Sequence, residues 1–203
     1  MDLYFSPLAC SMASRIVIYE TGGKADFHRV DTKTKRTVTG GDYLKINPKG
    51  LVPAVRTDDG RILTENAAIL PYLADAFSGG SLAGDGFERS LVQQWLSFIG
   101  TELHTGVFHP LFAPTAAPEV KAFARAEAVG RLTYLNDHLA GREWLTDRFT
   151  VADAYAAAVL NWAQFVKLDL APYPNIVAYV DRLKARSSVA KALREEFELF
   201  QAA

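Results

Sequence analysis

The feature that most constrains this fold is a change of pattern near residue 80. Before it, short apolar runs typical of strands alternate with helical periodicity, and after it only helical patterns continue. The polar stretch at residues 78–81, Ser-Gly-Gly-Ser, lies between them and suits a linker. We therefore expect one domain at residues 1–78, a linker at 79–86 and a second domain at 87–203.

The first segment predicts a mixed α/β domain. Strands are predicted at residues 3–5, 27–30, 52–55 and 61–64, and helices at 11–20 and 66–77. Asp58, Asp59 and Gly60 form a strong hairpin turn between the last two strands. This order indicates a mixed sheet covered by helices.

The second segment predicts an all-α domain. Helices are expected over residues 87–111 and 119–140, from Thr150, and in two short stretches after Pro174 and Ser188, with breaks at Pro114 and Pro118. Thr150 and Asp153 have the spacing of a capping box, in which each side chain bonds to the backbone of the other residue. We assign this pair to stability.

Charge and cysteine content limit the partners and the compartment. The 22 basic and 23 acidic residues balance, and no apolar run approaches the roughly 18 residues of a membrane span. The N-terminus lacks a signal-peptide pattern, and a single cysteine cannot form an internal disulfide. We expect a cytoplasmic globular protein that binds neither nucleic acid nor membrane.

The single cysteine lies where thiol chemistry is favoured. Cys10 follows a proline-containing turn and precedes a helix, whose free N–H groups and dipole favour an anion, so we expect a lowered thiol pKa. Ser11 supplies a neighbouring hydroxyl donor. The alternative is a buried, inert cysteine.

Two other junctions could hold the ends of a peptide-like ligand. A cis bond between Val52 and Pro53 would turn the Val52 backbone outward to pair with an extended ligand, although a strand-entry proline explains the sequence equally well. Glu65 and Asn66 open a helix, where they could bind an α-amino and an α-carboxylate group or simply cap the helix.

Three charged or titratable side chains have ordinary explanations too. Lys35 lies in an irregular basic segment that solvation alone could account for. Glu102 and His104 lie two residues apart on the first long helix and so face different directions, and a lone helical histidine is often structural.

Together these motifs resemble the glutathione S-transferases, most closely the bacterial beta class. The resemblance spans nearly the whole chain and is carried by residues 6–11, 47–54, 63–69, 95–104 and 149–153. It implies a thioredoxin-like N-terminal domain, an all-α C-terminal domain and a homodimer.

The resemblance also implies a site. Catalytic roles fall to Cys10, Ser11 and His104, and glutathione contacts to Lys35, Leu51, Val52, Pro53, Glu65, Asn66, Ser97, Thr101 and Glu102. The Val52 backbone would pair with the cysteinyl part, Glu65 and Asn66 with the γ-glutamyl end, and Lys35 with the glycyl carboxylate. This sequence departs from the family at three positions. It has Leu51 where glutamine is common, Asn66 where serine or glycine is more usual, and Thr105 where the beta class often has lysine.

The implied activity is conjugation of reduced glutathione, as co-substrate and without a metal, to small hydrophobic electrophiles in detoxification. Cys10 could add thiol–disulfide exchange. The candidate electrophile pocket, which core or dimer packing explains equally well, comprises Phe108, Phe112, Trp162 and Phe165. A glutathione-dependent lyase, dehalogenase or disulfide reductase on the same fold, or a non-catalytic binding protein, are the alternatives.

Overall fold

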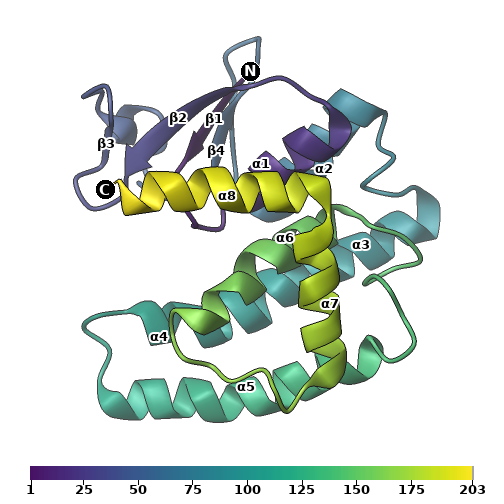
Figure 1. The fold of residues 1–203 in the computed structure, drawn as a ribbon. Helices are drawn as coiled ribbons and strands as arrows, with labels where there is room; N and C mark the ends of the chain where they lie inside the picture. The colour runs from purple at the N-terminus through teal and green to yellow at the C-terminus, as the bar shows by residue number, and fades with distance from the viewer. Residues whose placement is uncertain (203) are drawn as a thin grey trace.

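A five-stranded mixed sheet is built from the N-terminal segment of the computed structural model, which describes residues 1–202 (Figure 1). The strands are β1 (Asp2–Phe5), β2 (Asp26–Asp31), β3 (Arg36–Thr37), β4 (Ala54–Arg56) and β5 (Ile62–Thr64), in the order β3-β2-β1-β4-β5. β1 pairs in parallel with β2 and antiparallel with β4, and β4 and β5 form the predicted hairpin. The two-residue β3 was not predicted because it is too short and too polar to show periodicity.

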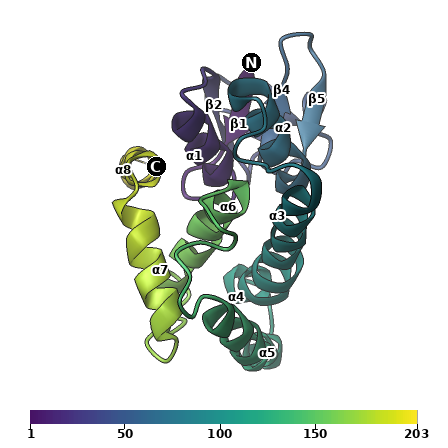
Figure 2. The ribbon, with the colours of Figure 1, turned by 90° about the vertical axis from the view of Figure 1, so that its right-hand side faces the viewer.

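Two α-helices and a 3-10 turn complete this segment. They are α1 (Met12–Thr21), η1 (Tyr43–Lys45) and α2 (Asn66–Ser78). Figure 2 shows α1 and α2 next to each other against the sheet. The interpretation of Asn66 as a helix cap was wrong: Asn66 is the first helical residue and Glu65 occupies the cap position without a side-chain bond to the helix.

The rest of the described chain is helical. Its elements are α3 (Gly86–Phe98), the π-helix η2 (Ile99–Phe108), α4 (His109–Phe112), α5 (Pro118–His138), α6 (Val151–Leu160), the 3-10 helix η3 (Asn161–Gln164), α7 (Pro174–Ala185) and α8 (Ser187–Gln201). The predicted helix at 87–111 is thus one continuous run of α3, η2 and α4 with a wide π turn inside it, which periodicity did not reveal. α8 has 15 residues rather than being short.

Two helices connect the helical part to the sheet. Every residue of α6 is buried, the helix packs against α1, and it begins with the predicted capping box of Thr150 and Asp153. α8 returns to the first segment, where it crosses beside α1 below the sheet (Figure 1). The loop between β1 and α1, which carries Cys10, therefore lies against helices from the far end of the chain.

Candidate active site

The loop before Cys10 is held on both sides by the helical part. Leu8 has a φ of 58°, a conformation that non-glycine residues adopt only when their surroundings impose it. Its N–H donates to Glu196 Oε2 (2.7 Å), and its C=O accepts from Trp162 Nε1 (2.7 Å). Two residues before the cysteine, the backbone is therefore fixed by α8 and η3.

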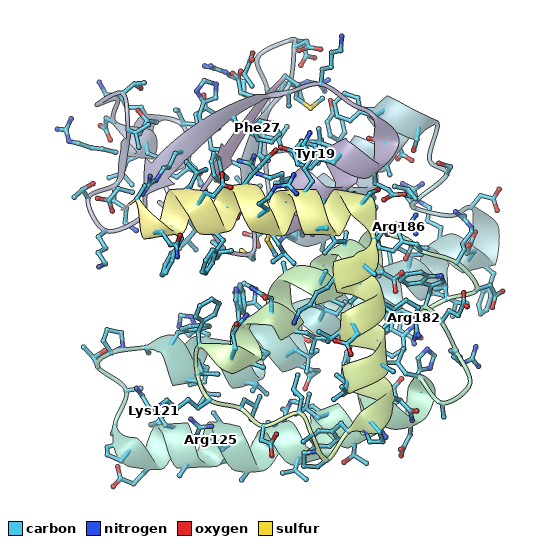
Figure 3. All side chains as sticks on the ribbon, viewed as in Figure 1. Tyr19, Phe27, Lys121, Arg125, Arg182 and Arg186 are labelled. Carbon is cyan, nitrogen blue, oxygen red and sulfur yellow. The ribbon has the colours of Figure 1, made fainter. Side chains whose placement is uncertain are left out.

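Glu196 is part of a buried ion pair that sequence reasoning missed. It is fully buried and accepts from Arg15 Nε at 2.9 Å. The Arg15 guanidinium lies 4.3 and 4.0 Å from the ring centres of Phe5 and Phe27, and Figure 3 shows Tyr19 and Phe27 close to α8. Burial raises the pKa of Glu196 to about 7, although Arg15 opposes the shift. Arg15, a charged residue among the buried apolar residues at the start of the first helix, was the available signal.

Cys10 is a neutral thiol in this setting. Its Sγ donates to the Val52 C=O at 3.2 Å. Burial raises the pKa of the Cys10 thiol to about 12, since the backbone N–H groups of Cys10 and Ser11 do not offset the loss of solvation. The prediction of a lowered pKa was therefore wrong.

The Ser11 hydroxyl is occupied within the same loop. The side chain is fully buried, accepts from the Ser6 N–H at 3.2 Å and donates to the Ser6 C=O at 3.2 Å. Its single proton is committed, so the structure contradicts the prediction that Ser11 is a free second donor beside the thiol.

The segment around Pro53 presents an open backbone edge. The bond between Val52 and Pro53 is cis, as one of the two interpretations predicted. The Val52 N–H has no partner within residues 1–202, while the Val52 C=O accepts from Cys10. The Leu51 C=O is bound by Tyr43 Oη at 2.8 Å, and the Leu51 side chain is exposed. An unpaired N–H beside a thiol suits an extended peptide backbone.

Glu65 presents an exposed carboxylate at the start of α2. Its φ is 71°, another left-handed conformation at the candidate site. The carboxylate is paired with Lys49 Nζ, which also donates to Thr64 Oγ1 at 2.9 Å. Lys49 was not among the predicted site residues, although it lies in the Asn-Pro-Lys-Gly motif that carried the resemblance.

Asn66 connects α2 to the cysteine loop. Its Nδ2 donates to the Cys10 C=O at 3.1 Å, while its buried Oδ1 has no protein partner within residues 1–202. The side chain therefore holds the backbone of Cys10 and keeps one acceptor available.

Lys35 contacts the chain just before the open edge. Its Nζ donates to the Gly50 C=O at 3.0 Å, and its φ is 59°. Three of the four non-glycine residues with positive φ in residues 1–202, namely Leu8, Lys35 and Glu65, thus belong to the candidate site or its supporting loop.

His104 is held by a buried tyrosine. Its Nδ1 lies 2.8 Å from Tyr155 Oη, and its ring meets that of Trp162 edge-on at 4.8 Å. Burial, with the charge of His109, lowers the pKa of His104 to about 4. Burial, with the nearby Cys10, raises the pKa of Tyr155, so the phenol keeps its proton. His104 is therefore neutral at pH 7.

This lowered pKa predicts a specific loss of stability in acid. Unfolded His104 binds a proton below about pH 6.5 and folded His104 only below about pH 4, so the folded state loses stability as pH falls through this window. Between pH 7 and 4.5 the loss from His104 is about 2 kcal/mol. Urea unfolding at both pH values should show a smaller decrease for His104→Gln than for the wild type. Equal decreases would contradict the assignment.

The predicted contacts on the helical side face outward in a single chain. Thr101 Oγ1 donates to the Ser97 C=O (3.0 Å) and to Glu102 Oε1 (3.1 Å), and Glu102 Oε2 accepts from Arg131 Nε (3.0 Å). Within residues 1–202 none of the three predicted residues contacts Cys10 through a hydrogen bond. Their role in binding glutathione stays a prediction.

Three of the four predicted electrophile-pocket rings lie together. Phe108 and Phe112 each meet Trp162 edge-on at 5.7 Å, and Trp162 also contacts His104. Phe108 is fully buried and so belongs to the core, whereas Phe112 is 45% exposed. Phe165 does not join the cluster and packs against Phe200 of α8 at 6.2 Å.

Two other features were sought across residues 1–202. That part of the chain holds no group of three histidine, cysteine, aspartate or glutamate side chains arranged to bind a metal ion. None of its helices combines the length and apolarity required to span a bilayer.

Comparison with known proteins identifies the family. Residues 9–76 match the model of the glutathione S-transferase N-terminal domain, and residues 101–187 match that of the C-terminal domain. The chain belongs to the glutathione S-transferase family. It is 42% identical over 199 residues to glutathione S-transferase GstA of Escherichia coli O157:H7, covering 97% of this chain and 98% of the relative.

Solved structures of glutathione S-transferases have the same fold as this chain. A sphingomonad glutathione S-transferase complexed with glutathione is 40% identical, with a TM-score of 0.92 and coverage of 97% of this chain and 98% of that one. The bacterial beta class glutathione S-transferase of Sphingomonas chungbukensis is 41% identical, with the same TM-score and the same coverage. The predicted thioredoxin-like domain, all-α domain and glutathione S-transferase enzyme are therefore confirmed.

Proposed function

We propose that this glutathione S-transferase conjugates reduced glutathione to small hydrophobic electrophiles, with the tripeptide lying along Val52. The main support is the unpaired Val52 N–H beside the Cys10 thiol, with the charged side chains of Lys35 and Glu65 bound to the neighbouring residues Gly50 and Lys49. An extended tripeptide adds its backbone to such an edge and places its central sulfur near residue 10. A sphingomonad relative that is 40% identical was solved in complex with glutathione, which supports glutathione as the ligand.

The site activates the glutathione thiol through neutral donors. A thiol with a pKa near 8.5 is only a few per cent ionised at pH 7, and lowering it by two units requires about 2.7 kcal/mol of preferential stabilisation of the thiolate. Cys10 keeps its proton, so it brings no second negative charge to the site, and its S–H becomes a donor to glutathione once it leaves the Val52 C=O. His104 is also neutral, and its ring is oriented by Tyr155.

The γ-glutamyl end would enter by exchanging partners at Glu65. The carboxylate is now paired with Lys49, and the ligand ammonium would replace that lysine. Asn66 Oδ1 is an unsatisfied acceptor beside the same helix start. A buried acceptor without a partner costs free energy, which a ligand donor would recover.

The electrophile would lie against the exposed ring of Phe112 and the edge of Trp162, next to His104. We further propose that the enzyme is a cytoplasmic homodimer that acts in detoxification. In such a dimer, the side chains of Ser97 at the end of α3 and of Thr101 and Glu102 in η2 complete the glutathione site.

Calorimetric titration with glutathione and S-hexylglutathione tests the proposal. Both ligands should bind, and the hexyl derivative should bind more tightly because its chain enters the apolar pocket beside the sulfur. Glu65→Gln should weaken both ligands about tenfold, the loss of roughly one charge-assisted hydrogen bond. The absence of binding to either ligand would refute the proposed function.

Replacing Cys10 separates two activities. Since Cys10 is a neutral donor, Cys10→Ala should lower conjugation of an aryl halide by less than about tenfold, the contribution of one neutral hydrogen bond. Disulfide exchange, in which Cys10 attacks a glutathione mixed disulfide to form Cys10–S–S–glutathione and release the other thiol, should be abolished. Loss of both activities would show that Cys10 participates directly in conjugation.

A further inference from the structure

Tyr155 and His104 join two helices at the candidate site. His104 lies within the π-helix η2, and Tyr155 lies in the middle of α6. Tyr155 Oη is 2.8 Å from His104 Nδ1, and the tyrosine is only 4% exposed. The pair therefore combines a titratable ring with a buried hydroxyl that is placed to control it.

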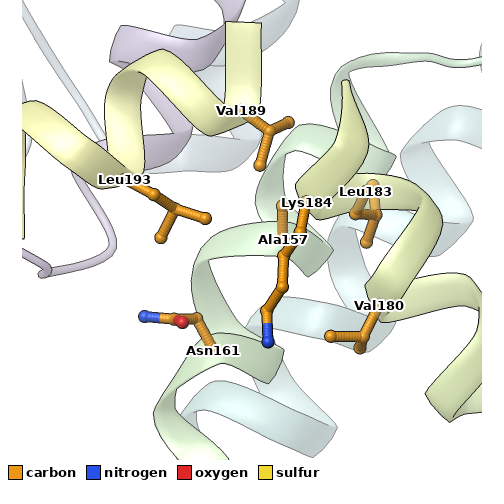
Figure 4. Close-up of a pocket in the computed structure, with 7 residues that line it drawn as sticks. All are labelled: Ala157, Asn161, Val180, Leu183, Lys184, Val189 and Leu193. Carbon is orange, nitrogen blue, oxygen red and sulfur yellow. The ribbon is translucent and has the colours of Figure 1, made fainter. Parts of the chain in front are cut away.

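The helix that carries Tyr155 is also packed on its opposite side. Residues two apart in an α-helix face in nearly opposite directions, since each step turns the helix by roughly 100°. Figure 4 shows Ala157 facing a pocket of about 10 Å³, which α7 and α8 close with Val180, Leu183, Lys184, Val189 and Leu193. A space of this size holds at most one water molecule. α6 therefore has no room to shift, and the Tyr155 hydroxyl is held in place.

The direction of the hydrogen bond between Tyr155 and His104 follows from the neighbouring groups. Burial raises the pKa of Tyr155, so the phenol keeps its single proton. Within residues 1–202, His104 Nδ1 is the one acceptor within hydrogen-bond distance of Tyr155 Oη. The amide of Asn66 does not compete for the proton, because it lowers the phenol pKa as a donor does and its Oδ1 has no protein partner. Tyr155 therefore donates to Nδ1.

This direction fixes the tautomer of His104. Burial lowers the pKa of His104 to about 4, so the ring is neutral at pH 7 and carries one proton. Because Nδ1 accepts from Tyr155, that proton is on Nε2. Within residues 1–202, Nε2 has no hydrogen-bond partner and is not fully buried. His104 thus presents an accessible N–H donor rather than a lone pair.

We propose that Tyr155 is a positioning residue that keeps His104 in its Nε2–H tautomer, so that His104 donates a hydrogen bond to the glutathione thiolate. The identity of the sulfur rests on the proposed function, whereas the tautomer is a property of the free enzyme. A donor to the charged form favours thiolate over thiol. With its lone pair already bound by Tyr155, His104 is not the base, and the thiol proton leaves to water.

Nitrogen NMR of the free enzyme with isotope-labelled histidine tests the tautomer without any ligand. Protonated and unprotonated ring nitrogens have well-separated chemical shifts, and the His104 signals are those that disappear in His104→Gln. Near neutral pH the wild type should have its proton on Nε2, and Tyr155→Phe should give a mixture of the two tautomers. A proton on Nδ1 in the wild type, or an unchanged spectrum in Tyr155→Phe, would overturn the proposal.

Tyr179→Phe is the matched control for loss of a buried phenol. Tyr179 is fully buried and donates to Asp153 at 2.7 Å, so its replacement lowers stability as Tyr155→Phe does. It should leave the His104 signals unchanged. A change of tautomer in Tyr179→Phe equal to that in Tyr155→Phe would show that the effect comes from general loosening of the fold, and would overturn the proposal.

The pKa of bound glutathione, read from the ultraviolet absorbance of the thiolate, tests the effect on the site. His104→Ala should raise this pKa by about one unit, the loss of one hydrogen bond to a charged group. Tyr155→Phe should raise it by about half a unit, because His104 then presents its donor only part of the time, and Tyr179→Phe should not shift it. Since Tyr155 acts through His104, the double variant should match His104→Ala.

Two outcomes of this titration would contradict the role of the pair. A shift from Tyr155→Phe that persists in the His104→Ala background would mean that the phenol acts on the sulfur directly, and would overturn the proposal. Absence of glutathione binding would overturn the proposed function and with it the role of the donor. The spectrum of the free enzyme distinguishes this failure from an incorrect tautomer.

Discussion

Replacing Asp153 with alanine is expected to destabilise the folded protein by about 4 kcal/mol, because four buried donor groups lose their acceptor. The carboxylate is fully buried and accepts from the Leu145 N–H (3.0 Å), the Thr150 N–H (2.8 Å) and Tyr179 Oη (2.7 Å). Thr150 Oγ1 adds a contact at 3.1 Å. Asp153 therefore fixes the start of α6, the loop at Leu145 and the face of α7 together.

Urea unfolding monitored by tryptophan fluorescence measures this effect. Asp147→Ala is the matched control, since Asp147 lies exposed in the same connection and makes no side-chain hydrogen bond within residues 1–202. It should change the free energy of unfolding by less than about 0.5 kcal/mol. If the two variants have similar stability, Asp153 does not organise this part of the fold.

Glu196→Ala should destabilise the protein by about 3 kcal/mol, because it leaves the buried Arg15 guanidinium with only the partly exposed Glu195 as an ion-pair partner. The Leu8 N–H loses its acceptor as well. Since this bond fixes the loop two residues before Cys10, we also expect a lower kcat for conjugation at a temperature where the variant remains folded. A measurement of kcat together with the unfolding curve separates the two effects.

Two conservative variants control this experiment. Glu196→Gln keeps an acceptor for Leu8 but removes the negative charge beside Arg15, so its stability should lie between those of the wild type and Glu196→Ala. Glu195→Gln changes the neighbouring, partly exposed carboxylate, which also contacts Arg15, and should cost less than about 1 kcal/mol. A loss below 1 kcal/mol for Glu196→Ala would show that the buried pair does not hold the domains together.

Local pattern was enough to predict most elements of the fold. Alternation and helical periodicity located the main strands, the hairpin at residues 58–60 and the helices, because these follow from which face of each element is buried. The capping box was also readable, since both of its partners lie within four residues of each other. The π-helix η2 was not predicted, because its wide turns leave no distinct signal in the apolar pattern.

Contacts between distant residues account for what the sequence could not reveal. Glu196 meets Leu8 across 188 positions, and Tyr155 meets His104 across 51. No local periodicity encodes either pair. The prediction of a lowered Cys10 pKa failed for the same reason. The helix start that favours a thiolate was visible in the sequence, but the burial that outweighs this effect was not.

A crystal structure with reduced glutathione tests the central claim most directly. The tripeptide should lie extended along residues 51–53, with its cysteinyl backbone accepting from the Val52 N–H and its ammonium in place of Lys49 on Glu65. Its sulfur should lie near Cys10 and His104. A bound tripeptide found elsewhere, with the Val52 N–H still unpaired and Lys49 still on Glu65, would contradict the account.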